Sequence, residues 1–516
     1  MEQKSNNSRR LRTVSLIVVI TLAGKVLGLV RDMLLGHNFA TGMEGAAFQV
    51  ASRIPRTFFD AIFASAISAS FIPVFAERME QHGREDAFRL SHCFFTWVGL
   101  LTAVFSLLGM ALADPIVGLL ADGFDPETAA LCAGLLRILF PTVFFTGVAF
   151  SMVGVLQSLG EFYIPAALSV ASNGVIILYY LLLCRRFGIR GLAWAFLLGW
   201  AVQMGMQMPW LRRNRFRYRP GLHHPGLRSV FTLMLPVMVS TWVQPLCLLI
   251  TTRFATHLFQ GAGASAMDYA NTLYTMIAGI LVLSVTNVIF PEMSRLSTGG
   301  RQEELVALIG SSLRGMLFLL LPMTAGLMLL AEPLVRLLYE WRNWDSFSTA
   351  VTARALIFMS IGMAGYGIQN VLVRAFYARQ DGRTPLISGA AAVVLNLALC
   401  FALTDRLDVA GLGIATAAST WASALVLLVP TIRRCPETLN RAFFLEIGKM
   451  LLAAAVMSLA VRGAAMLLPQ AWTGSLSGRV LSFGIPAAAG AAVYFLAASL
   501  LRLREMETVK GLLRRK

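Results

Sequence analysis

Apolar residues fill this chain in long runs that return at regular intervals. Each run holds roughly 20 residues, enough for a helix to cross about 30 Å of hydrocarbon, and there are about fourteen such runs. They begin near residues 13, 46, 90, 129, 163, 189, 229, 265, 305, 349, 385, 409, 444 and 480. The pattern predicts an all-α polytopic membrane protein with about 14 transmembrane helices.

Composition and charge agree with this prediction. Hydrophobic residues make up 57% of the chain and charged residues 14%, against about 25% charged residues in soluble domains. The net charge of +17 would suit nucleic acid as a partner. However, roughly 27 Lys and Arg gather in alternate loops and about 7 in the opposite loops, as the positive-inside rule expects. The charge therefore predicts cytoplasmic N- and C-termini and no nucleic-acid partner.

The two halves of the sequence resemble each other. Pro73 in "SFIPVFAERMEQHG" has a later counterpart in Pro291 in "VIFPEMSRLSTGG". Pro165 and Pro385, which open two later spans, are separated by nearly the same interval along the chain. We predict two pseudo-repeated six-helix lobes plus two C-terminal helices around a central cavity, as in transporters whose lobes rock around a shared site. The predicted domains are an N-lobe of helices 1–6 (1–222), a C-lobe of helices 7–12 (223–442), and helices 13–14 with a cytoplasmic tail (443–516).

Charged residues interrupt the first apolar run. The stretch "GKVLGLVRDMLLG" places Lys25, Arg31 and Asp32 inside the expected first span. A charge at the bilayer centre costs about 2.5–3.5 kcal/mol on insertion scales, and such residues usually face the bundle interior or a water-filled cavity. These three charges therefore predict a functional site.

Further charges are expected at a similar depth on two other spans. Arg53, Arg56 and Asp60 follow the spacing i, i+3, i+7, which places them on one stripe of the second helix. Arg253 is expected on the seventh span near the depth of Arg31, judged from the rise of about 1.5 Å per residue. Guanidinium groups from three helices would then line one chamber.

The predicted chamber contains more cationic than acidic side chains, and this excess indicates an anionic ligand. By sign alone, about three of these cations lack an acidic partner within the spans, and intramembrane charges normally pair or serve a substrate. Arginine suits a diphosphate because its planar fork donates bidentate hydrogen bonds. Two alternatives stay open: Arg53 and Arg253 snorkel to the surface along their stems, or Arg31 and Asp32 form a structural pair.

Nothing in the sequence indicates a cofactor. The six cysteines show no metal-binding spacing, so we expect no metal site and treat them as small hydrophobic residues. No "GxxxxGK[ST]" motif is present, so we expect no ATP use. Coupling to the membrane potential or to an ion is left open.

The charged segments also carry a resemblance to a known family. The segments "GKVLGLVRD" (24–32), "IPRTFFDAIFASAISASFIPVFAE" (54–77) and "RAFYARQDGRTP" (374–385) look like helix motifs of the lipid II flippase family MurJ, also called MviN. That family belongs to the multidrug/oligosaccharidyl-lipid/polysaccharide (MOP) exporter superfamily. The resemblance runs over nearly the whole chain.

The resemblance implies a flippase of the bacterial inner membrane that serves cell wall synthesis. It would move lipid II, an undecaprenyl-diphosphate-linked muropeptide, from the inner to the outer leaflet by alternating access. The implied partners are this lipid-linked anionic substrate, membrane lipids and the peptidoglycan synthesis machinery, and we expect a monomer. Arg31 and Asp32 match the family's charged pair in helix 1, and helices 13 and 14 match a groove for the lipid tail.

The sequence departs from the family pattern at several positions. Lys25 stands where Arg is usual, and Ala46 where an acid is usual. Family arginines are replaced by Phe59 in helix 2 and by Thr272 in helix 8, so Asn271 and Thr272 become candidate cavity residues together with Asp60. We hypothesise that Arg56 and Arg253 supply the missing charges.

Three other functions stay open at this point. A flippase for another polyprenyl-diphosphate-linked oligosaccharide, of the O-antigen or capsule type, would use the same cationic chamber. A drug or cation antiporter would need carboxylates to dominate the chamber, whereas arginines dominate here. A polyprenyl-linked transferase would need acids or a histidine at a water boundary, and the far-side "DGFDPE" (122–127) is the only dense acidic cluster.

Overall fold

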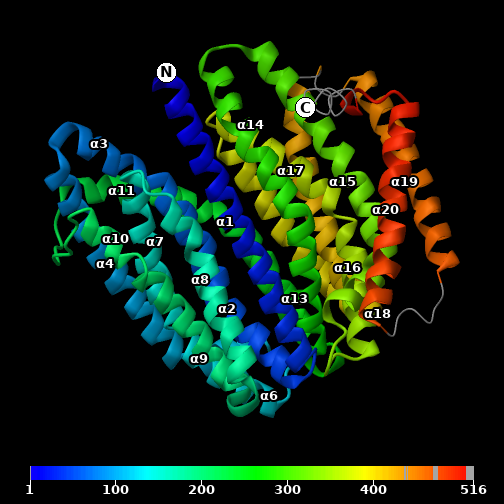
Figure 1. Cartoon of the computed structure of the whole chain (residues 1–516), viewed down its shortest axis with the longest axis horizontal. Coiled ribbons are helices and arrows are strands. Elements are labelled where there is room, and N and C mark those ends of the chain that lie inside the picture. The colour runs from blue at the N-terminus through cyan, green and yellow to red at the C-terminus, as the bar shows by residue number, and fades with distance from the viewer. Residues whose placement is uncertain (1, 435–436, 438–439, 469–474, 507–516) are drawn as a thin grey trace. The chain divides into compact units, whose positions relative to one another are not determined.

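The computed structural model is helical throughout its described part, residues 2–434, 437, 440–468 and 475–506. Side chains are described except at 2–15, 18, 58–66, 68–69, 235–241 and 243–244. Every described element is a helix (Figure 1). The prediction of an all-α protein is therefore confirmed.

Many of these helices are long enough to cross a membrane. Within the described residues nine helices meet the length and hydropathy needed, or ten if the bent pair Ser346–Ser360 and Met363–Ala378 forms one span. One of the nine, Arg383–Arg434, has 52 residues and a break at Asp408. At about 1.5 Å per residue it is more than twice as long as the hydrocarbon is thick. The chain is thus a multi-pass membrane protein, and the count of 14 stays a prediction.

The chain divides into two compact units, Met1–Pro245 and Leu246–Lys516. The helices of the N-terminal unit are α1 (Glu2–Phe39), α2 (Met43–Ala66), η1 (Ile67–Phe71), α3 (Ile72–His82), α4 (Arg84–Ala111), α5 (Ala113–Leu120), α6 (Pro126–Leu139), α7 (Thr142–Ser158), α8 (Tyr163–Leu182), α9 (Cys184–Gly205), α10 (Met208–Arg213) and α11 (Pro225–Thr241). Helix α12 (Val243–Thr256) begins at the boundary. The C-terminal unit continues with η2 (Phe259–Gly261), α13 (Ala262–Tyr274), η3 (Thr275–Gly279), α14 (Ile280–Thr298), α15 (Gln302–Tyr339), α16 (Ser346–Ser360), α17 (Met363–Ala378), α18 (Arg383–Arg434), α19 (Arg441–Leu467) and α20 (Leu476–Leu500).

In the N-terminal unit, helices distant in sequence pack side by side. Helix α1 lies along α8, α2 packs on α6 and α7, and α4 packs on α7 (Figure 1). Helix α11 packs on α2 and η1. It therefore belongs to the N-terminal unit, and the boundary between the two units lies after it. A buried hydrophobic core joins η1, α3, α4, α7, α10 and α11, and in it the rings of Phe71 and Phe94 stack at 4.6 Å. The predicted domain boundaries at 222 and 442 stay a prediction.

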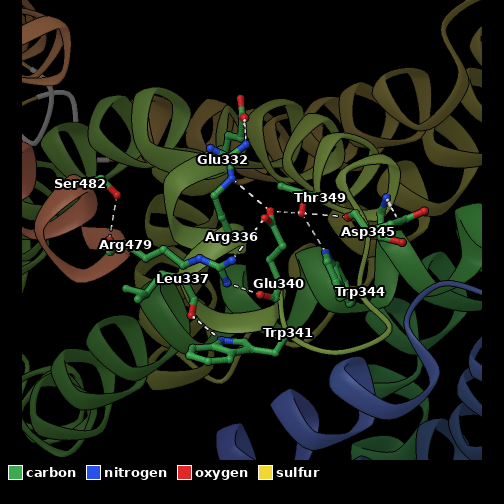
Figure 2. A network of polar contacts seen from close by, with 11 residues as sticks. Glu332, Arg336, Leu337, Glu340, Trp341, Trp344, Asp345, Thr349, Arg479 and Ser482 are labelled. Carbon is green, nitrogen blue, oxygen red and sulfur yellow. Dashed lines mark hydrogen bonds and ion pairs between the residues drawn. The ribbon is translucent and has the colours of Figure 1, made fainter. Parts of the chain in front are cut away.

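In the C-terminal unit, the long helix α15 is the central support. It contacts α16, α17, α19 and α20, and Tyr494 of α20 donates a hydrogen bond to the carbonyl of Phe318 at 2.6 Å. At the C-terminal end of α15, Glu340 accepts hydrogen bonds from Arg336 and Thr349, and Arg479 of α20 pairs with it (Figure 2). The two last helices are therefore fastened to α15 at several points.

The predicted repeat recurs in the backbone, where two pairs of landmarks share one offset in residue number. Asp125 caps α6 by accepting from the backbone N–H groups of Glu127 and Thr128, and Asp345 caps α16 by accepting from that of Ser348. Gly188 and Asp408 break α9 and α18 with nearly equal dihedral angles, φ 54° and ψ −149° against φ 52° and ψ −136°. These landmarks are independent of the proline pairs, so they support a duplication in which helices α19 and α20 are additions.

Candidate functional site

Arg31 on α1 is held by residues from two other helices of its unit. Its Nε donates to Asp32 Oδ1 at 2.9 Å, and its Nη2 lies 2.7 Å from the same oxygen. Nη1 donates to Asn173 Oδ1 on α8 at 3.1 Å. The guanidinium carbon lies 5.4 Å from the ring centroid of Phe196 on α9, within the range of a cation–π contact. Arg31 is therefore oriented before any ligand arrives.

Asn173 connects this cluster to the backbone of α1. Its Nδ2 donates to the carbonyl of Gly24 at 3.1 Å. A Cβ at Gly24 would lie 2.2 Å from Ser169 Oγ, so a larger residue there would force the Ser169 side chain to move. The side chain of Arg31 is 16% exposed and that of Asp32 20%. Since a guanidinium has five N–H donors, N–H groups on both terminal nitrogens remain for a ligand.

The second span presents its two arginines differently. Arg53 on α2 is buried, with 8% of its surface exposed, whereas Arg56 one turn later is exposed. Lys25 on α1 is also exposed and forms no ion pair with any residue whose side chain is described. The stripe predicted for α2 thus places one cation inside the N-terminal unit and another on its surface. The third member, Asp60, has a side chain outside the described residues.

The remaining candidates belong to the C-terminal unit. Arg253 is exposed on α12, and the hydroxyl of Thr256 donates to its carbonyl at 2.6 Å. Asn271 and Thr272 are half-buried on α13. Their carbonyls both accept from the hydroxyl of Thr275, at 2.8 and 3.2 Å. That these three side chains share a chamber with Arg31 and Arg53 stays a prediction.

A cavity of about 440 Å³ adjoins the Arg31 cluster within the N-terminal unit. It lies between α1, α7 and α8, and its polar lining comes from Thr21, Gln157 and Ser169. Lys25 follows Thr21 by four residues and so lies about one helical turn further along the same face of α1. The cavity therefore gives the N-terminal unit a polar recess about one helical turn from Lys25.

The sequence prediction overlooked Asn173, Phe196 and a polar seam beside them. Gln203 donates to Ser172 Oγ at 2.6 Å, and Gln207 donates to the carbonyl of Ala149 at 3.2 Å. The available signal was an amide within an otherwise apolar span, which is costly to bury unless it is hydrogen-bonded. Five of the six cysteines lie in the described part, four buried and Cys247 half-buried, and none of these five forms a disulfide.

With this geometry established, comparisons with known proteins identify the family. The family model described as "Lipid II flippase MurJ" matches residues 35–481, most of the chain. The chain belongs to this family. The predicted resemblance is confirmed, and membership in a flippase family makes the protein a transporter rather than an enzyme.

Curated relatives in the MurJ family cover most of the chain. A probable lipid II flippase MurJ from Rhizobium meliloti (strain 1021) is 30% identical over 494 residues, covering 93% of this chain and 91% of the relative. The lipid II flippase MurJ of Burkholderia cenocepacia is 28% identical over 442 residues, covering 83% of this chain and 84% of the relative.

Solved structures show the same MurJ-like fold. A lipid II flippase MurJ in an inward closed conformation aligns with a TM-score of 0.81 at 22% identity, over 94% of this chain and 98% of that one. An inward-facing multidrug resistance MATE family transporter of the MOP superfamily aligns with a TM-score of 0.70 at 16% identity, over 82% and 98%. At these identities the likeness concerns the fold alone.

Proposed function

We propose that this protein is a lipid II flippase that moves the lipid-linked peptidoglycan precursor from the inner to the outer leaflet for cell wall synthesis. The observation that carries the proposal is the family match over residues 35–481. The cationic residues on α1 and α2 fit an anionic cargo of this kind. A lipid-linked substrate and membrane lipids are the partners that such an activity requires.

The diphosphate of the cargo would be bound by guanidinium groups. Arg31 is fixed by Asp32 and Asn173, so little side-chain entropy would be lost when its remaining N–H groups bind phosphate. Arg53, Arg56 and Arg253 would complete the anion site, because arginine forks pair with phosphate oxygens in a bidentate manner. The mechanism we propose is alternating access, with the polyprenyl tail kept in lipid.

Lys25 and Asp32 would have supporting roles in this mechanism. The exposed ammonium of Lys25 would attract the cargo from the cytoplasmic side. Asp32 would orient Arg31 and partly neutralise the empty site. Asp60, Asn271 and Thr272 are proposed to line the cavity that holds the sugar and peptide.

We propose the membrane potential as the energy source. A potential of 100 mV is worth about 2.3 kcal/mol for each charge that crosses. Because the cytoplasm is negative, outward movement of an anionic diphosphate is favoured. The orientation that this requires, with both termini cytoplasmic in the inner membrane, follows from the positive-inside distribution of Lys and Arg. A monomer that serves the peptidoglycan synthesis machinery is the form we propose.

Complementation tests this function directly. The gene is expressed in a strain depleted of its own lipid II flippase, and growth is the expected result. Failure to grow, with the protein present in the membrane and able to rescue a strain lacking an O-antigen or capsule flippase, would replace lipid II by another polyprenyl-diphosphate cargo.

Charge variants in the same strain test the site. Arg31→Ala and Arg253→Gln are expected to abolish or strongly reduce rescue without reducing the amount of protein in the membrane, because each removes a phosphate ligand. Arg406→Gln is the control, since this exposed arginine of α18 lies outside the proposed site. Full rescue by Arg253→Gln would remove that residue from the site and with it the compensation hypothesis for Thr272.

A further inference from the structure

A large groove on the N-terminal unit lies apart from the Arg31 cluster. Its volume is about 1030 Å³, and it runs between α4, α7 and α10. Its floor and walls are apolar, with Phe95, Leu100 and Ala103 from α4 and Phe144 and Met152 from α7. From Phe95 to Ala103 the groove follows α4 for roughly 12 Å.

One end of this groove is basic. Arg212, Arg217 and Tyr218 form part of the lining there, within the stretch "LRRNRFRYRP" (211–220). Its five arginines are all exposed, and none of them forms an ion pair with a described residue. Asp86 at the start of α4 is engaged by Arg78 and His224 instead. The groove thus combines an apolar channel with uncompensated positive charge at its mouth.

The basic stretch is fixed against α4. Arg84 donates to the carbonyl of Asn214 at 2.7 Å, and the hydroxyls of Thr96 and Tyr218 lie 2.8 Å apart. Trp97 donates from its indole nitrogen to the carbonyl of Leu222 at 3.0 Å. Phe216 is buried between α4 residues, with its ring 5.5 Å from that of Phe95. The arginines are therefore presented from an ordered scaffold at the end of a membrane-spanning helix.

We propose that this groove is a specific binding site for an anionic phospholipid. The phosphate binds between Arg212 and Arg217, with Tyr218 at the interface, and one acyl chain lies along α4 in the apolar groove. Amphipathic aromatic rings such as Trp97 and Tyr218 are typical of the headgroup level. Clusters of Lys and Arg beside a transmembrane helix attract anionic lipid headgroups, and arginine forks suit phosphate oxygens.

The charge and depth of the groove distinguish this occupant from others. A zwitterionic phospholipid brings a phosphate but also a cationic group, so it would leave the net positive charge of the arginines uncompensated. A water-soluble anion would leave the exposed apolar walls, such as Leu100 at 52% exposed, without cover. A phospholipid with a net negative headgroup satisfies both. With the cytoplasmic orientation proposed above, the site faces the inner leaflet, and its lipid is distinct from the cargo bound near Arg31.

Lipid titration of the purified full-length protein, followed by native mass spectrometry, tests the proposal. Delipidated protein is titrated with phosphatidylglycerol or with phosphatidylcholine that carries the same acyl chains. We expect at least fivefold tighter binding of phosphatidylglycerol. The double variant Arg212→Gln/Arg217→Gln is expected to bind phosphatidylglycerol at least tenfold more weakly, with the same unfolding temperature in detergent.

Two further variants make the test specific. Arg213→Gln/Arg215→Gln removes the same charge from the same stretch but from residues that do not line the groove, and it is expected to change binding less than twofold. Ala103→Phe narrows the apolar channel and is expected to weaken both lipids. Equal losses in the two double variants, or equal binding of the two lipids by the unaltered protein, would overturn the proposal.

Discussion

At the scale of single residues, Arg31 is an oriented charge rather than an isolated one, because Asp32, Asn173 and Phe196 contact its guanidinium. Asp32 lowers the cost of keeping its guanidinium inside a helical bundle, because paired and hydrogen-bonded charges are tolerated where isolated ones are not. Asn173 fixes the orientation of the Arg31 guanidinium relative to the backbone of α1, because its Oδ1 accepts from Arg31 while its Nδ2 donates to the carbonyl of Gly24. An amide can do both, which a carboxylate or a hydroxyl in that place would do less well.

Replacing Asn173 by alanine is expected to slow flipping about tenfold. The variant loses one hydrogen bond to a charged group, worth about 1.5–3 kcal/mol, and Arg31 then loses its orientation. The measurement is lipid II flipping by purified protein in liposomes, together with the unfolding temperature. Gln203→Ala is the control, because it removes an amide from the same seam without touching Arg31. An unchanged rate in Asn173→Ala would show that Arg31 needs no support from α8.

The sequence could identify Arg31 and Asp32 but not Asn173 and Phe196. A charge within an apolar run is costly wherever the helix packs, so it is informative before any contact is known. An amide or a phenyl ring is compatible with many helix neighbours. Its role depends on the packing of α1 against α8 and α9, which periodicity alone does not fix. For the same reason the burial of Arg53 and the exposure of Arg56 could not be predicted from their shared stripe.

At the scale of helices, the end of α15 carries a polar network that fastens three elements together. Glu340 accepts from Arg336 Nε at 3.1 Å and from the Thr349 hydroxyl at 3.0 Å (Figure 2). Arg479 of α20 lies with its Nη2 3.6 Å from Glu340 Oε1 and with its guanidinium over the ring of Trp341. Glu340 is thus the shared acceptor that joins α15, α16 and α20.

Glu340→Gln is expected to lower the free energy of unfolding by about 1–3 kcal/mol, because it removes the negative charge and replaces one acceptor oxygen by an NH2 group that faces charged donors in a partly buried site. Glu332→Gln makes the same chemical change in the same network at a more exposed position, where an ion pair is worth about 0–1 kcal/mol. Thermal unfolding can be followed with a thiol-reactive dye that labels the buried cysteines as they become exposed. Equal effects of the two variants would mean that Glu340 is not the shared acceptor.

The turn between α17 and α18 depends on a single carboxylate. Asp381 accepts from the backbone N–H of Thr384 at 3.1 Å and from its hydroxyl at 2.9 Å, and Arg434 donates to it at 3.2 Å. Burial raises the pKa of Asp381, but the hydrogen bonds from Thr384 and the hydrogen bond and charge of Arg434 outweigh it and lower the pKa below its ordinary value. The ionised form therefore stabilises the folded state.

Asp381→Asn is expected to cost about 1 kcal/mol at neutral pH, because it removes the negative charge that pairs with Arg434 and one of the two acceptor oxygens. Since the folded-state pKa lies below the unfolded value of about 3.9, the contribution of Asp381 is fully present above that value and is lost as the pH falls through the folded pKa. The difference in unfolding temperature between the two proteins should therefore shrink below about pH 4. Asp405→Asn, which changes an exposed residue without a polar contact to any described residue, should show no such difference.

At the scale of the whole molecule, hydropathy predicts the class of protein well because the bilayer sets the length of each helix. The repeat was also visible, since prolines at matching positions of the two halves keep a nearly constant offset in residue number. The extent of each helix was less predictable. The 52 residues of α18 continue through two apolar runs with a break at Asp408, whose φ is 52°. Glycine is the residue expected at a positive φ, so an aspartate does not mark such a break in the sequence.

The orientation of the molecule can be measured by cysteine accessibility. In spheroplasts, a membrane-impermeant thiol reagent is expected to label Gly123→Cys and to leave Arg215→Cys unlabelled. The reason is that the acidic loop at 121–127 is predicted outside and the basic stretch at 211–220 inside. Permeabilised cells, in which both variants should react, provide the control. Labelling of Arg215→Cys alone in spheroplasts would invert the topology.

One offset in residue number relates Asp125 to Asp345 and Gly188 to Asp408, so helix caps and helix breaks of the first half have counterparts in the second. The side chains at other counterpart positions differ between the halves. The same offset pairs Arg31 with Thr251, whose hydroxyl donates to the buried Asn396 of α18 at 3.4 Å. After a gene duplication, a polar contact between two helices could thus be kept in both halves, while only the first half has a guanidinium at this position. The charge at this position is therefore carried by the first half alone, whereas Arg253, the arginine of the second half that we propose as a phosphate ligand, lies two residues further along α12.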